Sequence, residues 1–129
     1  MRILFVSQWD RCRGPICRIL AASMARKEGL EDMVFDSAGV EAKGGEPACV
    51  EVITFLQREK YNALPPRSKP LSIELADNAD VVFCMTREIL RQTKELLGDY
   101  YAPKVLLLTK GVDLETRKVD VEFPNLNSW

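Results

Sequence analysis

The sequence has 129 residues and a mass of 14.6 kDa, enough for one domain that buries about two-thirds of its unfolded surface without disulfide staples. Apolar residues make up 47% and the net charge is -1, so the composition is that of an ordinary globular fold and gives no reason to expect nucleic-acid or membrane partners. No apolar run approaches transmembrane length, and the first residues lack the long apolar stretch and cleavage site of a signal peptide.

The predicted elements alternate between strand and helix. In chain order, the pattern predicts a strand over 1–6, a helix over 15–28, a strand over 33–35, a helix over 47–58, a short helix over 73–76, a strand over 81–85, a helix over 87–97 and a strand over 105–108. Pro15 suits the first position of a helix, and Gly29 ends the same helix. Ser72 and Thr86 are expected to cap the helices that follow them.

Alternating elements with strands that are apolar on both faces indicate an α/β fold, a parallel sheet with helices on both faces. We expect a single three-layer domain over 1–129, with an irregular or shortened tail from about residue 110. In the second long helix, Val50, Ile53 and Leu56 are expected to face inward. The tail has little chain left for a further helix, so either it packs on the domain directly or a second copy covers the exposed surface as a homodimer.

The numbers of cysteines and histidines indicate the redox state of the protein's compartment and whether it can bind a metal ion. The four cysteines are Cys12, Cys17, Cys49 and Cys84. They are too few and too scattered for a disulfide scaffold, which favours a reducing cytoplasm. The chain has no histidine and no clustered acids, so we predict no metal site and no cofactor.

The segment after the first strand carries the strongest functional signal. The apolar run ends at Ser7, a polar loop follows, and Gly14-Pro15 opens an amphipathic helix. Backbone N–H groups and the positive end of a helix converge in such a loop and suit an anion such as phosphate. Arg13 lies at the end of the loop, where a guanidinium can hold two phosphate oxygens. The plain alternative is an ordinary strand-to-helix turn with surface arginines.

The pattern Val6-Ser7-x5-Arg13-Gly14-Pro15 resembles the phosphate-binding loop of the low-molecular-weight protein tyrosine phosphatases, which is V-C-x5-R-S-P. Four further stretches resemble the same family in the same order: DSAG at 36–39, RSKPL at 67–71, ADVVFCMT at 79–86 and KVLLL at 104–108. The resemblance runs from the first residue to about Thr109. It implies four parallel strands in the order 2-1-3-4. It also implies a phosphate-binding loop formed by Ser7, Gln8, Trp9, Asp10, Arg11, Cys12 and Arg13.

Ser7 stands where the family has its nucleophilic cysteine. A free thiol has a pKa of about 8.5, so a loop that stabilises anions can ionise it, whereas a serine hydroxyl in the same place stays protonated. Serine enzymes use an adjacent base, usually histidine, and this chain has none. Asp10 in the same loop is the remaining candidate base, and a weak one.

The resemblance also places the acid that protonates the leaving group, an aspartate within a late D-x-x-D-P segment of the family. Residues 120–124 align with this segment without a gap and put Phe123 at the acid position. Glu122 can substitute only if the tail shifts by one residue. General acid assistance is typically worth about 10²–10⁴ in rate, so its loss would matter.

Three loop positions depart from the family as well: Trp9 replaces a glycine, Asp10 an asparagine and Gly14 a serine. Asp10 either repels phosphate or accepts the loop's own N–H bonds and plugs the site, while Arg11 compensates its charge.

Cys12 has two interpretations: an inert buried thiol, or a reactive one favoured by the neighbouring arginines and a helix N-terminus. The other three cysteines are predicted to be core residues. Cys12-x5-Arg18 also satisfies C-x5-R, but the helix that begins at Pro15 contains most of it, so we reject it as a phosphate loop.

The leading hypothesis is a phosphatase-like protein that is catalytically impaired and binds a phosphate-like anion, a phosphorylated protein or a phosphorylated small molecule. The alternatives are a genuine phosphomonoester hydrolase with an unconventional nucleophile, an active enzyme in which Ser7 was substituted for cysteine as a trap, and a redox protein similar to the arsenate reductases. In the redox reading, Cys12 and Cys84 are the candidate thiols.

Overall fold

The computed structural model describes residues 1–108. The elements are β1 (Arg2–Ser7), α1 (Arg13–Lys27), β2 (Val34–Gly39), α2 (Val50–Arg58), α3 (Ile73–Asn78), β3 (Val81–Cys84), α4 (Arg87–Leu97), a 3-10 helix η1 (Asp99–Lys104) and β4 (Val105–Leu107). The strands form one sheet in the order β2-β1-β3-β4, with every neighbouring pair parallel. The predicted fold class and strand order are confirmed. The predicted tail from about residue 110 lies outside the described residues.

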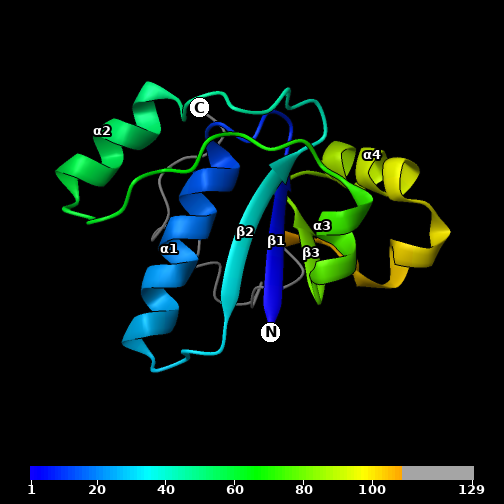
Figure 1. Cartoon of the computed structure of the whole chain (residues 1–129), viewed down its shortest axis with the longest axis horizontal. Coiled ribbons are helices and arrows are strands. Elements are labelled where there is room, and N and C mark those ends of the chain that lie inside the picture. The colour runs from blue at the N-terminus through cyan, green and yellow to red at the C-terminus, as the bar shows by residue number, and fades with distance from the viewer. Residues whose placement is uncertain (109–129) are drawn as a thin grey trace.

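Successive residues of β1 enter two separate cores, one on each face of the sheet. Figure 1 shows α1 and α2 on one side of the sheet and α3 and α4 on the other. Ile3 and Phe5 pack with the buried sides of α1 and α2. Leu4 and Val6 pack with residues of α3 and α4. The alternation of side chains along a strand explains why the whole run had to be apolar, since neither face is left to water. The result is three layers with β1 in the middle of the central one.

The predicted helix caps are confirmed. The Ser72 hydroxyl accepts a hydrogen bond of 3.2 Å from the Leu75 N–H, and the Thr86 hydroxyl accepts one of 3.1 Å from the Ile89 N–H. Each bond satisfies a backbone donor that the first turn of a helix leaves without a partner. Gly29 follows the end of α1 with a φ of +71°, a conformation that glycine adopts without a steric cost.

Several boundaries differ from the prediction. α1 begins at Arg13, so Pro15 is the third residue of the helix rather than the first. β2 extends through Gly39, because its parallel pairing with β1 continues to the pair Ser7 and Gly39. α2 begins at Val50 rather than at residue 47, since the backbone before it is extended. The buried side chains of α2 are Val52 and Leu56, whereas Val50 and Ile53 are exposed, so the predicted inward face was wrong in part.

In the described part of the chain, no helix is both long enough and apolar enough to cross a bilayer.

Candidate functional site

The candidate site is the connection between β1 and α1, residues 8–12. It begins at the carboxyl end of β1, whose neighbours β2 and β3 lie on opposite sides of it. This is the point where ligands of open parallel sheets bind. The segment after β2 runs alongside the loop, because the Val40 N–H donates to the Ser7 carbonyl at 3.0 Å and the Glu41 N–H to the Gln8 carbonyl at 2.8 Å.

Gly39, the last residue of β2, allows this close approach. A Cβ atom at Gly39 would lie 2.8 Å from backbone atoms of Gln8, Trp9 and Asp10. Real Cβ atoms do not come so close to backbone, so any side chain here would push the loop away from the sheet. The glycine in the DSAG stretch therefore positions the loop.

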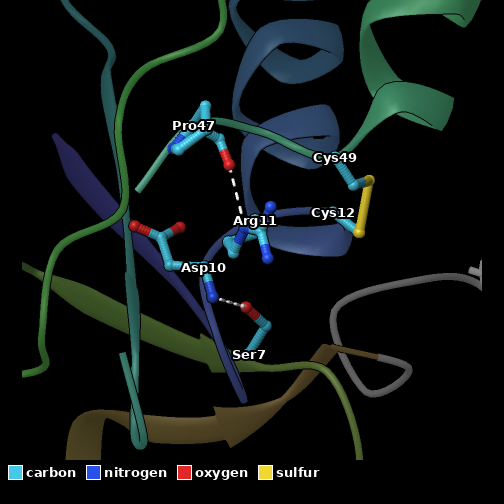
Figure 2. Close-up of a disulfide and its surroundings, with 6 residues drawn as sticks. All are labelled: Ser7, Asp10, Arg11, Cys12, Pro47 and Cys49. Carbon is cyan, nitrogen blue, oxygen red and sulfur yellow. Dashed lines mark hydrogen bonds between the residues drawn. A yellow bond between two sulfur atoms is a disulfide. The ribbon is translucent and has the colours of Figure 1, made fainter. Parts of the chain in front are cut away.

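Asp10 braces the loop from behind. Its side chain is only 1% exposed and its φ is +56°, a left-handed conformation that aspartate tolerates better than most residues. Its N–H donates to the Ser7 hydroxyl at 3.2 Å, and its carboxylate accepts a 2.9 Å bond from the Lys69 N–H. Figure 2 shows the carboxylate pointing away from Ser7. The carboxylate therefore does not accept the loop's own N–H bonds, which was one of its two predicted roles, but accepts the N–H of Lys69, 59 positions away.

Burial raises the pKa of the Asp10 carboxyl group to about 6. The Ser37 hydroxyl, the Lys69 N–H and the Lys69 charge oppose this rise, and the nearby charge of Asp36 adds to it. One carboxylate oxygen of Asp10 is buried without a hydrogen bond of full geometry. Keeping a carboxylate ionised in this place costs free energy at neutral pH.

The substitution Asp10→Asn is expected to stabilise the protein. The carboxyl group has a higher pKa in the folded than in the unfolded state, so its contribution to stability falls as the pH rises from about 4 to 6. Asparagine keeps an oxygen for the Lys69 N–H without the charge. We expect the free energy of unfolding at pH 7 to rise by about 1–3 kcal/mol, and its pH dependence between 4 and 6 to flatten, both measured by urea unfolding. Asp32→Asn, an exposed carboxyl group, is the control and should change neither.

A cavity of about 170 Å3 opens beside the start of α1. It lies between the β1–α1 loop with its flanking residues and the first turns of α4 with the segment before it, and it is lined by Ser7, Gln8, Arg13, Met85, Thr86, Glu88, Ile89 and Gln92. The Arg13 side chain is half-buried and makes no hydrogen bond or ion pair with any residue from 1 to 108. A cation held without a partner at a helix N-terminus, beside an open cavity, is arranged to receive an anion.

The seven residues predicted to bind phosphate are divided by the structure. Ser7, Gln8 and Arg13 line the cavity. Trp9 is 45% exposed and does not line it, and the Arg11 side chain donates to the Pro47 carbonyl at 2.9 Å. Asp10 accepts the Lys69 N–H, and Cys12 is bonded to Cys49.

Sequence reasoning missed the side of the cavity formed by α4 and the two residues before it, Met85 and Thr86. Thr86 and Gln92 belong to it, and so does Glu88, which pairs with Arg91 on the same helix. The available signal was the ADVVFCMT stretch, whose final threonine follows a strand at the same sheet edge as Ser7.

Cys12 and Cys49 form a disulfide, with their Cα atoms 5.5 Å apart (Figure 2). This corrects two predictions: Cys12 is not a free thiol, and Cys49 is not simply a core residue. Cys84, the other candidate thiol of the redox reading, is not bonded to Cys12. The two cysteines are 37 positions apart, and only the packing of the chain after β2 against the loop brings them together. The Glu51 carboxylate lies within 4.8 Å of both sulfurs, but sulfurs bonded to each other are not the thiolates that metal ions need.

Cys17 and Cys84 are buried, free thiols, as predicted. Burial raises the pKa of Cys17 to about 12, even though the positive charge of Arg13 opposes it. Burial also raises the pKa of Cys84. Both thiols stay protonated and inert at neutral pH.

Two predicted features do not add to this site. Arg18, the arginine of the rejected second pattern, lies within α1 and pairs with Asp36 on β2 at 3.1 Å. The predicted acid position Phe123 and its substitute Glu122 lie outside the described residues.

Together, the fold and the loop describe a class: a parallel α/β protein in which an arginine at the start of the first helix lines a cavity beside the end of the first strand. The model of the family "Low molecular weight phosphotyrosine protein phosphatase" matches residues 2–128, so the chain belongs to this family. The resemblance inferred from five short stretches is confirmed.

Relatives with known names belong to the same family. The chain is 40% identical over 115 residues to a protein-arginine-phosphatase of Bacillus subtilis (strain 168), covering 87% of this chain and 73% of that protein. It is similar to a structure of a YwlE arginine phosphatase mutant with a phosphorylated active-site serine, with a TM-score of 0.80, 36% identity and coverage of 87% and 72%. A low molecular weight protein tyrosine phosphatase from T. tengcongensis has a TM-score of 0.80, 31% identity and coverage of 88% and 77%.

Proposed function

We propose that this chain is a catalytically impaired phosphatase-like protein that binds a phosphate group at the loop from Ser7 to Arg13. The observation that carries the proposal is the half-buried Arg13 guanidinium, which has no partner within residues 1–108 and lines a cavity next to Ser7. Among the N–H groups of residues 8–12, only that of Asp10 donates a hydrogen bond within the described chain. The others remain available for the oxygens of a phosphoryl group.

The same geometry supports the loss of the covalent step. The Ser7 hydroxyl accepts a hydrogen bond from the Asp10 N–H, and no hydrogen bond joins it to the Asp10 carboxylate, the candidate base in the loop. Nothing else in residues 1–108 hydrogen-bonds to the Ser7 side chain to take its proton. An unactivated serine is a poor nucleophile at neutral pH.

The ligand class follows from the relatives. One is a protein-arginine-phosphatase and another a protein tyrosine phosphatase. We therefore propose phosphorylated proteins as partners, with a phosphoarginine or phosphotyrosine side chain in the cavity, and retain a phosphorylated small molecule as the alternative. A cytoplasmic location remains part of the proposal.

Replacing Arg13 tests the proposal. Trp129→Phe leaves Trp9 as the single tryptophan, so its fluorescence can report a titration with inorganic phosphate. Because charge-assisted hydrogen bonds contribute about 1.5–3 kcal/mol, we expect Arg13→Met to weaken phosphate binding at least about tenfold. Arg58→Met, on the surface of α2, is the control and should bind as the parent does. Equal affinity of the Arg13→Met variant would contradict the proposed site.

A second candidate function is slow phosphoryl transfer to Ser7 that stops at phosphoserine. The observation in its favour is the YwlE mutant structure, in which the active-site serine is phosphorylated. In this step the Ser7 oxygen bonds to phosphorus, the bond from phosphorus to the substrate breaks, and the leaving group takes up the serine proton. Intact mass after incubation with phosphoarginine separates the two functions, since only transfer adds one phosphoryl group, and Ser7→Ala must abolish it.

A further inference from the structure

Three links tie the phosphate loop to the segment that precedes α2, and Figure 2 shows two of them, the disulfide and the bond from Arg11 to Pro47. The Cys12–Cys49 disulfide is the covalent one. The Cys49 N–H donates to the Arg11 carbonyl at 2.8 Å, and the Arg11 side chain donates to the Pro47 carbonyl at 2.9 Å. Cys12 is the N-cap residue of α1 and Cys49 that of α2, so the disulfide joins the starts of two helices.

We propose that Cys12 and Cys49 are a reversible thiol–disulfide site whose redox state sets the affinity of the loop for oxyanions. The oxidised form is the tighter binder. The part of this proposal that concerns affinity rests on the proposed function of the loop.

The position of the pair favours exchange with external reagents. Neither cysteine is fully buried, unlike Cys17 and Cys84. The positive ends of α1 and α2 and the neighbouring arginines stabilise the thiolates that form when the bond opens. The pair is therefore the accessible redox couple among the cysteines of this chain.

The chemistry balances with two classes of reagent. A dithiol reductant attacks one sulfur, forms a mixed disulfide and closes its own ring, which leaves Cys12 and Cys49 as two thiols and the reductant oxidised. A peroxide takes two electrons and two protons from the pair, which restores the disulfide and yields two waters.

The disulfide acts on the loop through Cys12, which directly precedes Arg13. Bonding Cys12 to Cys49 fixes the N-cap residue of α1, which leads directly into Arg13 and the first N–H groups of the helix. The other side of the loop is already held by Asp10 and Gly39. α2 buries only Val52 and Leu56, so its packing alone restrains Cys49 weakly.

The device differs from oxidation of a catalytic cysteine. Ser7 occupies the nucleophile position, so no sulfur lies there to be oxidised. The bond between Cys12 and Cys49 also lies on the side of the loop turned away from Ser7 (Figure 2). Oxidation therefore leaves the anion position open and only rigidifies the loop around it, which lowers the ordering cost of binding.

The proposal is tested by titrating the Trp129→Phe protein with inorganic phosphate, once after peroxide treatment and once in dithiothreitol. Both titrations contain a chelator, because the reduced thiols of Cys12 and Cys49 together with Glu51 could bind metal ions. We expect the oxidised form to bind about three- to tenfold more tightly, as expected for removing the ordering cost of one or two groups. Cys49→Ser should bind as the reduced protein does and should not respond to dithiothreitol.

Thiol titration of the denatured protein reports the bond itself. We expect two free thiols after oxidation and four after reduction. Four free thiols after peroxide treatment would overturn the proposal. Equal phosphate affinity in the two redox states, with Arg13→Met still weakening binding, would also overturn it. That last pattern leaves the proposed function intact. No phosphate binding in either state would overturn both the inference and the proposed function.

Discussion

Ser7→Cys alone is expected to give little hydrolysis of an aryl phosphate, and Ser7→Cys with Phe123→Asp is expected to exceed it by about 10²–10⁴ in rate. The first substitution supplies a sulfur that the helix N-terminus and Arg13 can hold as a thiolate. The second restores an acid for the leaving group at the position that the resemblance assigns. The measurement is kcat with p-nitrophenyl phosphate, and Ser7→Ala with Phe123→Asp is the matched control that should remain inactive.

Gly14→Ser is the last substitution to add to the Ser7→Cys and Phe123→Asp variants. A Cβ at Gly14 would lie 2.9 Å from an Asp10 carboxylate oxygen and 3.1 Å from the Ser7 hydroxyl, so the larger residue needs both neighbours to move. Asparagine has the same size as aspartate, so Asp10→Asn does not relieve this contact, and Gly14→Ser should destabilise the loop with or without it. High activity of the Ser7→Cys variant would show that the residues at positions 9, 10 and 14, which differ from those of the family, are compatible with catalysis. Ser7 would then be the single cause of inactivity.

The structure already bears on how serious those departures are. Trp9 is half-exposed outside the cavity lining, and the Asp10 carboxylate holds the Lys69 N–H, a bond that an asparagine oxygen could also accept. The loop keeps a shape that leaves Arg13 beside the cavity. Loss of function is thus expected to come from two missing chemical groups, the nucleophile and the acid, rather than from a collapsed loop.

The sequence was sufficient for features that depend on local chemistry. The apolar runs and the capping residues Ser72 and Thr86 predicted the elements, and the resemblance predicted the strand order and so the place of the loop. Local signals failed where two distant segments meet. The start of α2 is delayed because Cys49 hydrogen-bonds to the Arg11 carbonyl, a contact that no periodicity records.

The direction of the Asp10 side chain and the pairing of Cys12 were unpredictable for the same reason. The partner of Asp10 is the N–H of Lys69, 59 positions away, and the partner of Cys12 is 37 positions away. Cysteine counting treats four scattered thiols as reduced, because spacing alone says nothing about which residues the fold brings within bonding distance. The side of the cavity formed by α4 was missed because it faces the loop across the sheet edge rather than along the chain.

Opening the disulfide is expected to lower the free energy of unfolding by about 4 kcal/mol, the chain-entropy value for a cross-link that spans 37 positions. Urea unfolding with and without dithiothreitol measures this difference. Cys12→Ser combined with Cys49→Ser should match the reduced parent and respond to no reductant, which separates loss of the bond from other effects of the reagent. Thiol titration could show that dithiothreitol breaks the bond while the stability of the parent protein stays the same. That result would mean that residues 40–49 are held against the loop by Arg11 and Gly39 alone. The disulfide would then add no restraint that the fold lacks, and the expected difference in phosphate affinity would vanish with it.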